Sequence, residues 1–148
     1  MTSGIQPPPA TTMTTAPERS EWSRDSAPSD EELELLRRYV DAHERADADG
    51  LAVLLRKDAL LTMPPHPTWF DGREAIMIAM RPAFTPEFGS LRAVLTAANT
   101  QPAVAHYLRA PGETEHRALA LDVLRIQDRR IAEISSFPSA ELFVANAY

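Results

Sequence analysis

The chain has no cysteine among its 148 residues and only five glycines. Without cysteine it cannot form disulfides, a thiol nucleophile or a zinc–thiolate site, so nothing indicates an oxidising compartment. It also lacks a Gly-rich phosphate loop, a paired-glycine dinucleotide fingerprint, a G-x-S-x-G elbow and an H-E-x-x-H sequence. These absences argue against nucleotide binding, serine hydrolysis and zinc-protease chemistry.

Long apolar runs and blocks of positive charge are missing as well. No apolar segment approaches the roughly 18–20 residues of a membrane span, and the N-terminus lacks the basic start and apolar centre of a signal peptide. The net charge is −6, whereas duplex binding needs a basic face that displaces counterions. We therefore expect a soluble, cytoplasmic protein that binds neither nucleic acid nor a membrane.

Proline is distributed unevenly along the chain. Five of the thirteen prolines fall within residues 1–28, among Thr, Ser and Ala and with few apolar residues. Such a stretch cannot bury enough surface to offset the entropy of ordering it. We predict a disordered tail over residues 1–28 and one folded domain over residues 29–148.

The first helix is predicted to begin near Asp30, because Ser29 and Glu32 have the spacing of a capping box. Apolar or partly apolar residues then recur three and four positions apart and form one stripe, made of Leu33, Leu36, Tyr39, Val40 and His43. Further helices are predicted over 51–55 and 73–80, with a helical turn over 140–145. A loop is predicted over 64–72, and strands over 59–63, 91–98, 103–108, 117–126 and 131–137. Helices followed by a meander of strands indicate an α+β fold, with helices covering one face of a curved sheet.

Asp122 is the main anomaly in this pattern. The strand period of two places it in an apolar row with Ala120, Leu124 and Ile126. Burying an ionised, unpaired carboxylate is prohibitive, so Asp122 must be protonated, hydrogen-bonded or at a solvated cavity wall. The opposite row is apolar in its middle and charged at both ends, which leaves the alternative that Asp122 is simply exposed.

Several residues could join Asp122 in a polar cluster. Tyr39 and His43 lie one turn apart on the helix stripe, and a carboxylate beside an imidazole commonly orients a general base. Each of the two is, taken alone, more often an ordinary core residue. His66 could reach the same site from its proline-stiffened loop or lie on the surface, and His106 could face inward from its strand. No histidine pair has the i, i+4 spacing of helical metal ligands, so we expect no metal.

Three segments resemble the SnoaL-like branch of the NTF2-like superfamily, namely YVDAHERADADGLAVLL (39–55), DALLTMPP (58–65) and GREAI (72–76). That superfamily includes polyketide cyclases, ketosteroid isomerase and limonene epoxide hydrolase. Segments 63–65, 99–103 and 137–143 are similar to the SnoaL-like domain at the C-terminus of certain extracytoplasmic-function sigma factors. The resemblance implies, for a free-standing domain, an NTF2-like cone in which three N-terminal helices and a curved antiparallel sheet surround a pocket.

The resemblance also suggests roles for residues. The ketosteroid isomerase pattern places its oxyanion tyrosine at Tyr39 and its protonated oxyanion aspartate at Asp122. Its general base would fall at Met63, which cannot accept a proton, so steroid isomerisation by that mechanism is not expected. The sigma-appended domain typically has uncharged residues at positions 43, 66, 106 and 122, where this chain has three histidines and an aspartate. These departures favour an enzyme over a regulatory appendage.

Our first hypothesis is a small, cofactor-independent enzyme that cyclises, isomerises or dehydrates an apolar, polyketide-like or polycyclic molecule. His43, oriented by Asp122, would move a proton, Tyr39 would donate to a developing oxyanion, and His66 would assist. The substrate-binding residues would be Met63, Trp69, Phe70, His106, Leu124 and Phe137.

Two other hypotheses remain open at this point. The first is a non-catalytic domain that binds a ligand or regulates transcription. The second is an epoxide hydrolase, which would need an Asp-Arg-Asp set although only one inward carboxylate is visible. The alternating apolar strands would also permit a homodimer.

Overall fold

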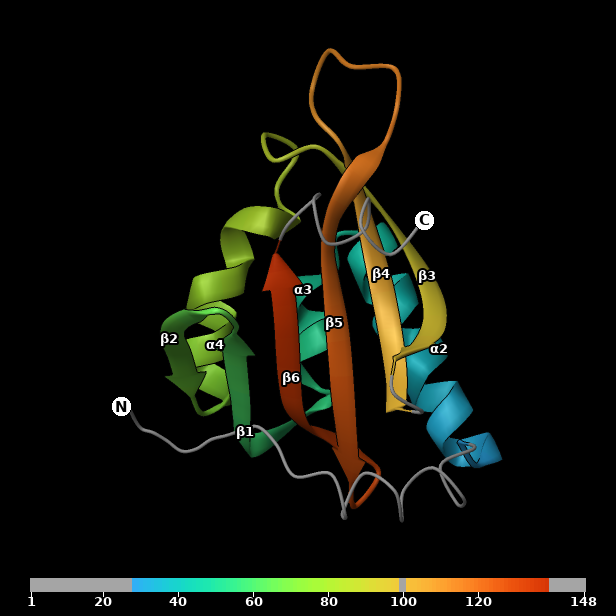
Figure 1. Cartoon of the computed structure of the whole chain (residues 1–148), viewed down its shortest axis with the longest axis vertical. Coiled ribbons are helices and arrows are strands. Elements are labelled where there is room, and N and C mark those ends of the chain that lie inside the picture. Colours follow the sequence, from blue (N-terminus) through green and yellow to red (C-terminus); the bar gives the residue numbers. More distant parts are fainter. Residues whose placement is uncertain (1–27, 99–100, 139–148) are drawn as a thin grey trace.

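The computed structural model describes residues 28–98 and 101–138. The predicted tail up to residue 27 and the predicted helical turn over 140–145 lie outside the described residues. The elements in chain order are α2 (Asp30–Glu44), α3 (Ala48–Ala52), β1 (Leu55–Met63), β2 (His66–Asp71), α4 (Arg73–Met80), the 3₁₀ helix η2 (Arg81–Phe84), β3 (Ser90–Ala98), β4 (Gln101–Arg109), β5 (Arg117–Gln127) and β6 (Arg130–Pro138) (Figure 1).

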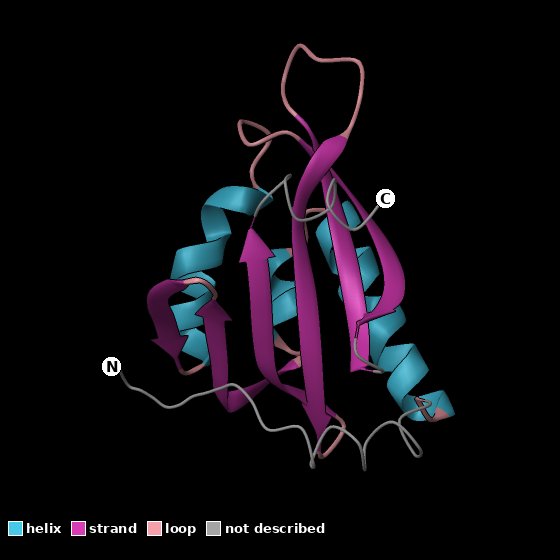
Figure 2. Cartoon of the chain, viewed as in Figure 1, coloured by secondary structure: helices cyan, strands magenta, loops and turns pink. Residues whose placement is uncertain are grey.

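The strands form one curved, open sheet in the order β2-β1-β6-β5-β4-β3. Helices α2 and α3 lie behind this sheet in Figure 1, and α4 lies beside β1 and β2. Figure 2 shows the same separation, with the helices gathered on one side of the strands. The predicted α+β architecture, with helices covering one face of a curved sheet, is therefore confirmed. None of the helices in the described ranges is long and apolar enough to cross a membrane.

One pair of neighbouring strands differs from the antiparallel sheet that we expected. Strands β3 to β6 follow one another as an antiparallel meander, but β1 runs parallel to β6. The reason is topological, since β1 enters the sheet before the meander begins and joins it beside the last strand. A parallel pair needs a long connection between its strands, and here the connection is the chain from β2 to β5.

Strand β2 forms where a loop was predicted. It pairs with β1 alone, with Thr62 opposite Trp69 and Leu61 opposite Phe70. An edge strand tolerates Pro67, because a proline without an N–H group can face away from the one neighbouring strand. Helix α3 also begins earlier than predicted, since the side chain of Asp47 accepts a hydrogen bond from the Gly50 amide and caps it.

Helix α2 begins at the predicted capping box. The Ser29 hydroxyl accepts from the Glu32 amide, and the Glu32 carboxylate accepts from the Ser29 amide, each at 3.1 Å. The predicted stripe packs against the sheet, and its members Leu36 and Tyr39 are fully buried. The largest side chains of the core are Tyr39, Leu36, Leu51, Leu55, Ile76, Leu124, Ile131, Ile134 and Val104.

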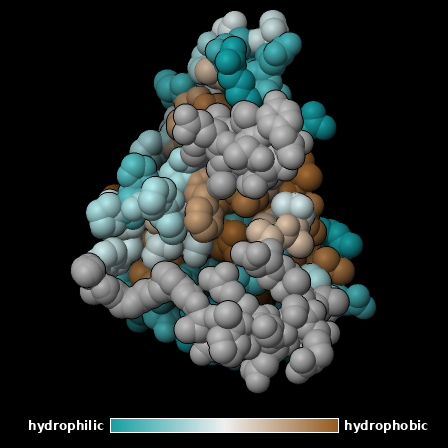
Figure 3. Space-filling model, viewed as in Figure 1, coloured by the Kyte–Doolittle hydropathy of each residue, from teal (hydrophilic) through white to brown (hydrophobic). Residues whose placement is uncertain are grey.

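The register of the strands decides which side chains face the helices, because cross-strand partners share a face of the sheet. Asp122 pairs with Val104 on one side and with Ser136 on the other, and all three belong to the face that packs against α2. The opposite face is turned toward the viewer in Figure 3. Hydrophilic residues cover its upper end, over the β4–β5 connection, and hydrophobic residues show near its middle.

The capping box gives a first prediction. Replacing Ser29 by Ala removes one of the two reciprocal hydrogen bonds at the start of α2, and should lower the free energy of unfolding by about 1 kcal/mol. Urea unfolding followed by circular dichroism measures the change. Thr114→Ala, in the exposed β4–β5 connection, serves as the control and should leave stability unchanged. Equal stability of the two variants would contradict the role assigned to Ser29.

Candidate functional site

Four polar side chains meet in the interior between helix α2 and the sheet. Tyr39 and His43 come from α2, His106 from β4 and Asp122 from β5. His43, His106 and Asp122 are each only 4% exposed to solvent, and Tyr39 is fully buried. We call these four residues the polar cluster.

Local structure explains why the four residues converge. Tyr39 and His43 are one helical turn apart, so both point from α2 toward the sheet. In the β4–β5 ladder Val104 pairs with Asp122 and His106 with Ala120. His106 and Asp122 are therefore diagonal neighbours on the face that α2 covers.

The Asp122 carboxylate is the centre of the cluster. Its Oδ2 atom accepts a hydrogen bond from the Tyr39 hydroxyl at 2.7 Å and lies 2.8 Å from Nε2 of His106. Burial by itself acts to raise the pKa of this carboxyl, but His106 and the hydrogen bonds from His106 and Tyr39 outweigh it and hold the pKa at about 2. An ionised carboxylate only accepts, so Nε2 of His106 carries the proton and donates it.

An ionised Asp122 corrects one implication of the family resemblance. In the ketosteroid isomerase pattern this aspartate is protonated, and it donates to the oxyanion together with the tyrosine. Here the tyrosine donates to the aspartate instead. Burial, and then the neighbouring Asp122, raise the pKa of the Tyr39 hydroxyl well above its usual value, so the hydroxyl keeps its proton. The geometry therefore directs the Tyr39 proton at Asp122 and not at a substrate.

His43 is held by the backbone of its own helix and not by Asp122. Its Nδ1 atom lies 2.8 Å from the Tyr39 carbonyl oxygen, and since a carbonyl only accepts, Nδ1 must carry the proton. Burial, and then the proximity of His106, lower the pKa of His43 to about 4. The ring is therefore neutral at pH 7, with a free electron pair on Nε2.

Two nitrogens of the cluster lack a partner. Nε2 of His43 and Nδ1 of His106 are buried and make no hydrogen bond within residues 28–98 and 101–138, and the two rings lie 4.5 Å apart between centroids. Leaving a buried polar atom unpaired costs about 1–3 kcal/mol. Such atoms are uncommon in folded proteins and call for an explanation, of which a functional role is one.

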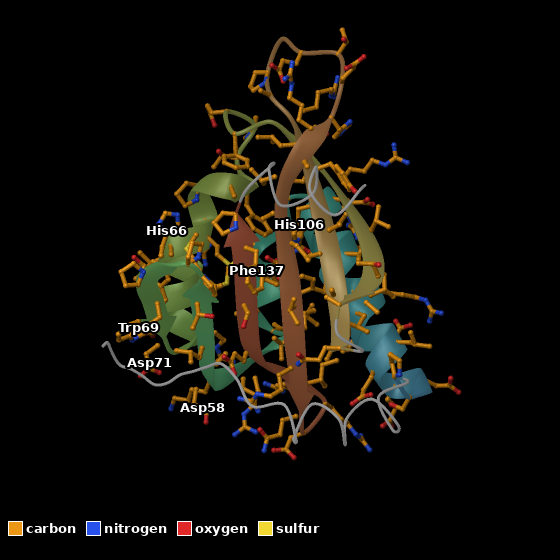
Figure 4. The ribbon with its side chains drawn as sticks, viewed as in Figure 1. Asp58, His66, Trp69, Asp71, His106 and Phe137 are labelled. Carbon is orange, nitrogen blue, oxygen red and sulfur yellow. The ribbon has the colours of Figure 1, made fainter. Side chains whose placement is uncertain are left out.

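Three predicted site residues lie away from the cluster. His66 is exposed on the edge strand β2, and Figure 4 shows it well apart from His106. Trp69 is opposite Thr62 and is 52% exposed. Phe137 is opposite Leu121, one residue out of phase with Asp122, so it belongs to the other face of the sheet. The structure therefore does not place Trp69 and Phe137 around the cluster, and their role in substrate binding stays a prediction.

Other predicted lining residues do belong to the interior side. Leu124 is fully buried and lies two residues from Asp122 on the same strand face. Phe70 is opposite Leu61 and packs against the core, and Met63 is half-buried at the end of β1. Sequence reasoning missed Phe84 of η2, whose ring lies 5.2 Å from that of His43, because nothing in its spacing marks it.

The surface hollows lined by described residues lie elsewhere. One of about 790 Å³ is bordered by charged residues that include Arg56, Asp58 and Asp71, and Figure 4 shows the two aspartates on the β1–β2 side. Another of about 260 Å³ lies beside Gly89 and Arg109. Neither of these two hollows includes a member of the cluster.

The cluster also contains the only three residues of the described ranges that meet the geometry of a metal site. His43, His106 and Asp122 each offer a donor atom within 4.8 Å of the other two. Two of the three come from strands and one from a helix. The sequence rule based on histidines four residues apart could not detect such a set.

Acid should destabilise the protein through His43, whose ring faces Tyr39, His106 and Asp122. The pKa of His43 is about 4 in the folded protein and about 6.5 in the unfolded chain. Between these two pH values the unfolded chain binds a proton that the folded protein does not, so stability decreases as the pH is lowered. From pH 7 to pH 5 the loss from this group is about 2 kcal/mol. The lowered pKa of Asp122 adds to the loss only below about pH 4.

Urea unfolding at pH 7, 6 and 5 measures this effect. His43→Gln lacks the titrating ring. Its loss of stability from pH 7 to pH 5 should therefore be smaller than that of the natural protein by about 2 kcal/mol. An equal pH dependence in the variant and the natural protein would contradict the assignment of a neutral, buried His43.

Comparison with solved structures supports the fold. An NTF2-like protein of unknown function from Mesorhizobium loti superposes with a TM-score of 0.58 at 20% identity, over 76% of this chain and 97% of that one. A putative ketosteroid isomerase from Kribbella flavida superposes with a TM-score of 0.59 at 20% identity, over 72% of this chain and 76% of that one. At this identity the likeness concerns the fold alone.

Comparison of sequences defines the family. The chain is 38% identical over 124 residues to the ECF RNA polymerase sigma factor SigG of Mycobacterium tuberculosis, which covers 81% of this chain and 32% of that protein. This chain thus spans about a third of the length of its sigma-factor relative. The sequence profile of the SnoaL-like domain matches residues 36–134. The chain therefore belongs to the SnoaL-like domain family and has an NTF2-like fold.

Proposed function

We propose that this domain is a small enzyme that moves a proton on an apolar carbonyl compound, with His106 as the proton acceptor. The observation that carries the proposal is the arrangement of His106, whose Nε2 is bound to the Asp122 carboxylate while its Nδ1 is buried without a partner. A carboxylate on one imidazole nitrogen orients the ring and favours protonation of the other nitrogen. From the sequence we expected His43 to be the residue oriented by Asp122. In the structure the Tyr39 carbonyl orients His43.

The proposed reaction begins with the transfer of a proton from a carbon next to the carbonyl group to Nδ1 of His106. The electron pair of the broken C–H bond moves into the enolate, and the positive charge on the imidazole is balanced by Asp122 through the Nε2–H bond. Returning the proton to a different carbon completes an isomerisation. Alternatively, the enolate carbon attacks a second carbonyl of the same molecule and forms a C–C bond. The carbonyl π electrons move to oxygen, which takes the proton back from Nδ1 of His106 and completes a cyclisation.

His43 and Tyr39 support this step in different ways. Nε2 of His43 is a second free acceptor next to the first, since the two imidazole rings lie 4.5 Å apart between centroids. The Tyr39 hydroxyl keeps Asp122 in place and ionised. The surrounding residues are apolar, for example Leu124, Val104 and Phe84, which favours an apolar substrate and strengthens the charge interactions inside the site.

A second function is supported by the relation to the sigma factor SigG. The matched part of that protein, 38% identical over 124 residues, belongs to a transcription factor. By this analogy the domain would bind a small molecule without changing it and would act on a transcription partner. The same interior cluster would then recognise the ligand through its two free imidazole nitrogens.

Deuterium exchange distinguishes the two functions. The protein is incubated in D₂O, with EDTA, with a panel of apolar cyclic ketones and 1,3-diketones and with any small molecule that co-purifies, and deuterium uptake is measured by mass spectrometry. We expect the natural protein to exchange at least one compound. His106→Gln and Asp122→Asn should lower the rate by about 10²- to 10⁴-fold, because positioned general-base catalysis commonly contributes that much.

His116→Gln is the matched control, since His116 lies in the β4–β5 connection away from the cluster, and it should exchange at the natural rate. Folded His106→Gln and Asp122→Asn proteins that exchange as fast as the natural one would contradict the proposed enzyme. Binding of a compound without any exchange would favour the ligand-binding function instead.

A further inference from the structure

We propose that the polar cluster is also a binding site for one divalent first-row transition metal ion, with His43, His106 and Asp122 as ligands. This inference goes beyond the proposed proton transfer and does not depend on it. It concerns which partner satisfies Nε2 of His43, a buried nitrogen that makes no hydrogen bond with the described residues.

The first argument is the chemical character of the unpaired atom. Nδ1 of His43 donates to the Tyr39 carbonyl, so in the neutral ring Nε2 carries a buried electron pair. No described residue donates a hydrogen bond to this nitrogen. It needs a donor or a Lewis acid, and a metal ion is the Lewis acid that imidazole nitrogens commonly bind.

The second argument is geometry. Each of the three residues offers a donor atom within 4.8 Å of the other two. Around an ion held at about 2.0–2.2 Å from its ligands, neighbouring donor atoms are roughly 3.0–3.6 Å apart. Nε2 of His106 and Oδ2 of Asp122 are already 2.8 Å apart. An ion between them would take the place of the Nε2 proton, which moves to Nδ1 of the same ring, and Nε2 of His43 would be the third ligand.

The third argument is the support around the ligands. Ligating histidines usually donate their second N–H to a carbonyl or carboxylate, which fixes the ring, and ligating carboxylates are themselves hydrogen-bonded. Tyr39 supplies both contacts, since its carbonyl accepts from His43 and its hydroxyl donates to Asp122. One residue of α2 thus orients two of the three ligands.

The ligand set selects the class of ion. Two imidazoles and one carboxylate suit Zn²⁺, Co²⁺, Ni²⁺ and Fe²⁺, whereas Mg²⁺ and Ca²⁺ prefer oxygen ligands alone. One carboxylate balances part of the ion's charge in a site from which water is largely excluded. With the ion bound, Nδ1 of His106 carries the ring proton and Nε2 of His43 is a ligand, so neither nitrogen can accept a proton from a substrate. Bound metal should therefore inhibit the proposed reaction.

Titration of the untagged, EDTA-treated and desalted protein with Co²⁺ tests the proposal. We expect one Co²⁺ per chain, d–d absorption bands between about 500 and 650 nm typical of a protein-bound ion with few ligands, and displacement by Zn²⁺. His43→Gln and His106→Gln should each weaken binding at least 100-fold. Tyr39→Phe should weaken it about 10- to 100-fold, as loss of an outer contact usually does. His116→Gln is the matched control and should bind as the natural protein does.

Imidazole nitrogen resonances of the natural protein give a test that needs no variant. Addition of one equivalent of Zn²⁺ should shift the ring nitrogens of His43 and His106 and leave those of His66 and His116 unchanged. Shifts confined to His66 and His116, or no Co²⁺ binding at 1 mM protein, would overturn the metal site.

The outcome is separate from that of the proton-transfer experiment, which is carried out in EDTA. Exchange without metal binding would leave the enzyme and remove the metal site. Metal binding without exchange would leave the metal site and remove the proposed enzyme.

Discussion

The two hydrogen bonds that Asp122 accepts hold the functional part of this molecule together. One comes from Tyr39 in the first helix and the other from His106 in the neighbouring strand. Through them the helix is fixed against the sheet at the point where both imidazole rings are buried. If the carboxylate lost either donor, a buried negative charge would keep a single partner, and hydrogen bonds to charged groups contribute about 1.5–3 kcal/mol each.

A purely apolar interior would be the simpler way to join α2 to the sheet. Replacing buried ionic groups by well-packed apolar residues is often neutral or stabilising. The cluster combines an ionised carboxylate, two imidazoles and a phenol, and two of its nitrogens have no partner. Strongly perturbed groups of this kind concentrate at functional sites. Stability alone therefore does not account for these four residues, and both the proposed proton transfer and the proposed metal site would give them a function.

The sequence was sufficient for features that depend on local spacing. The capping box at Ser29 and helix α4 over Arg73–Met80 follow from residue spacing and appear in the structure. Periodicity left two alternatives for Asp122, and the structure shows the inward one. Features that depend on register could not be read in the same way. Phe137 and Ser136 are adjacent in sequence, yet only Ser136 shares the face of Asp122, and a shift of one residue reverses such an assignment.

Partners within the cluster were equally inaccessible to sequence reasoning. Asp122 was expected to orient His43, but the cross-strand diagonal brings His106 to it, and the i−4 carbonyl takes His43. A buried imidazole N–H group requires one hydrogen-bond acceptor, and both a carboxylate and a backbone carbonyl can provide it. Only the positions of β4 and β5 relative to α2 decide between them.

The distance along the chain between Tyr39 and Asp122 has a consequence for how the protein is made. These residues are 83 positions apart. Strand β1 can likewise form its parallel pairing only after β6, a distant segment of the chain, is present. Contacts between distant segments form slowly, because the entropy of closing the loop must be overcome first. During synthesis the helix with two of the four cluster residues exists long before the strand that carries the carboxylate. The site is therefore among the last parts of the domain to be assembled, and a chain truncated before β5 would leave Tyr39 and His43 facing solvent.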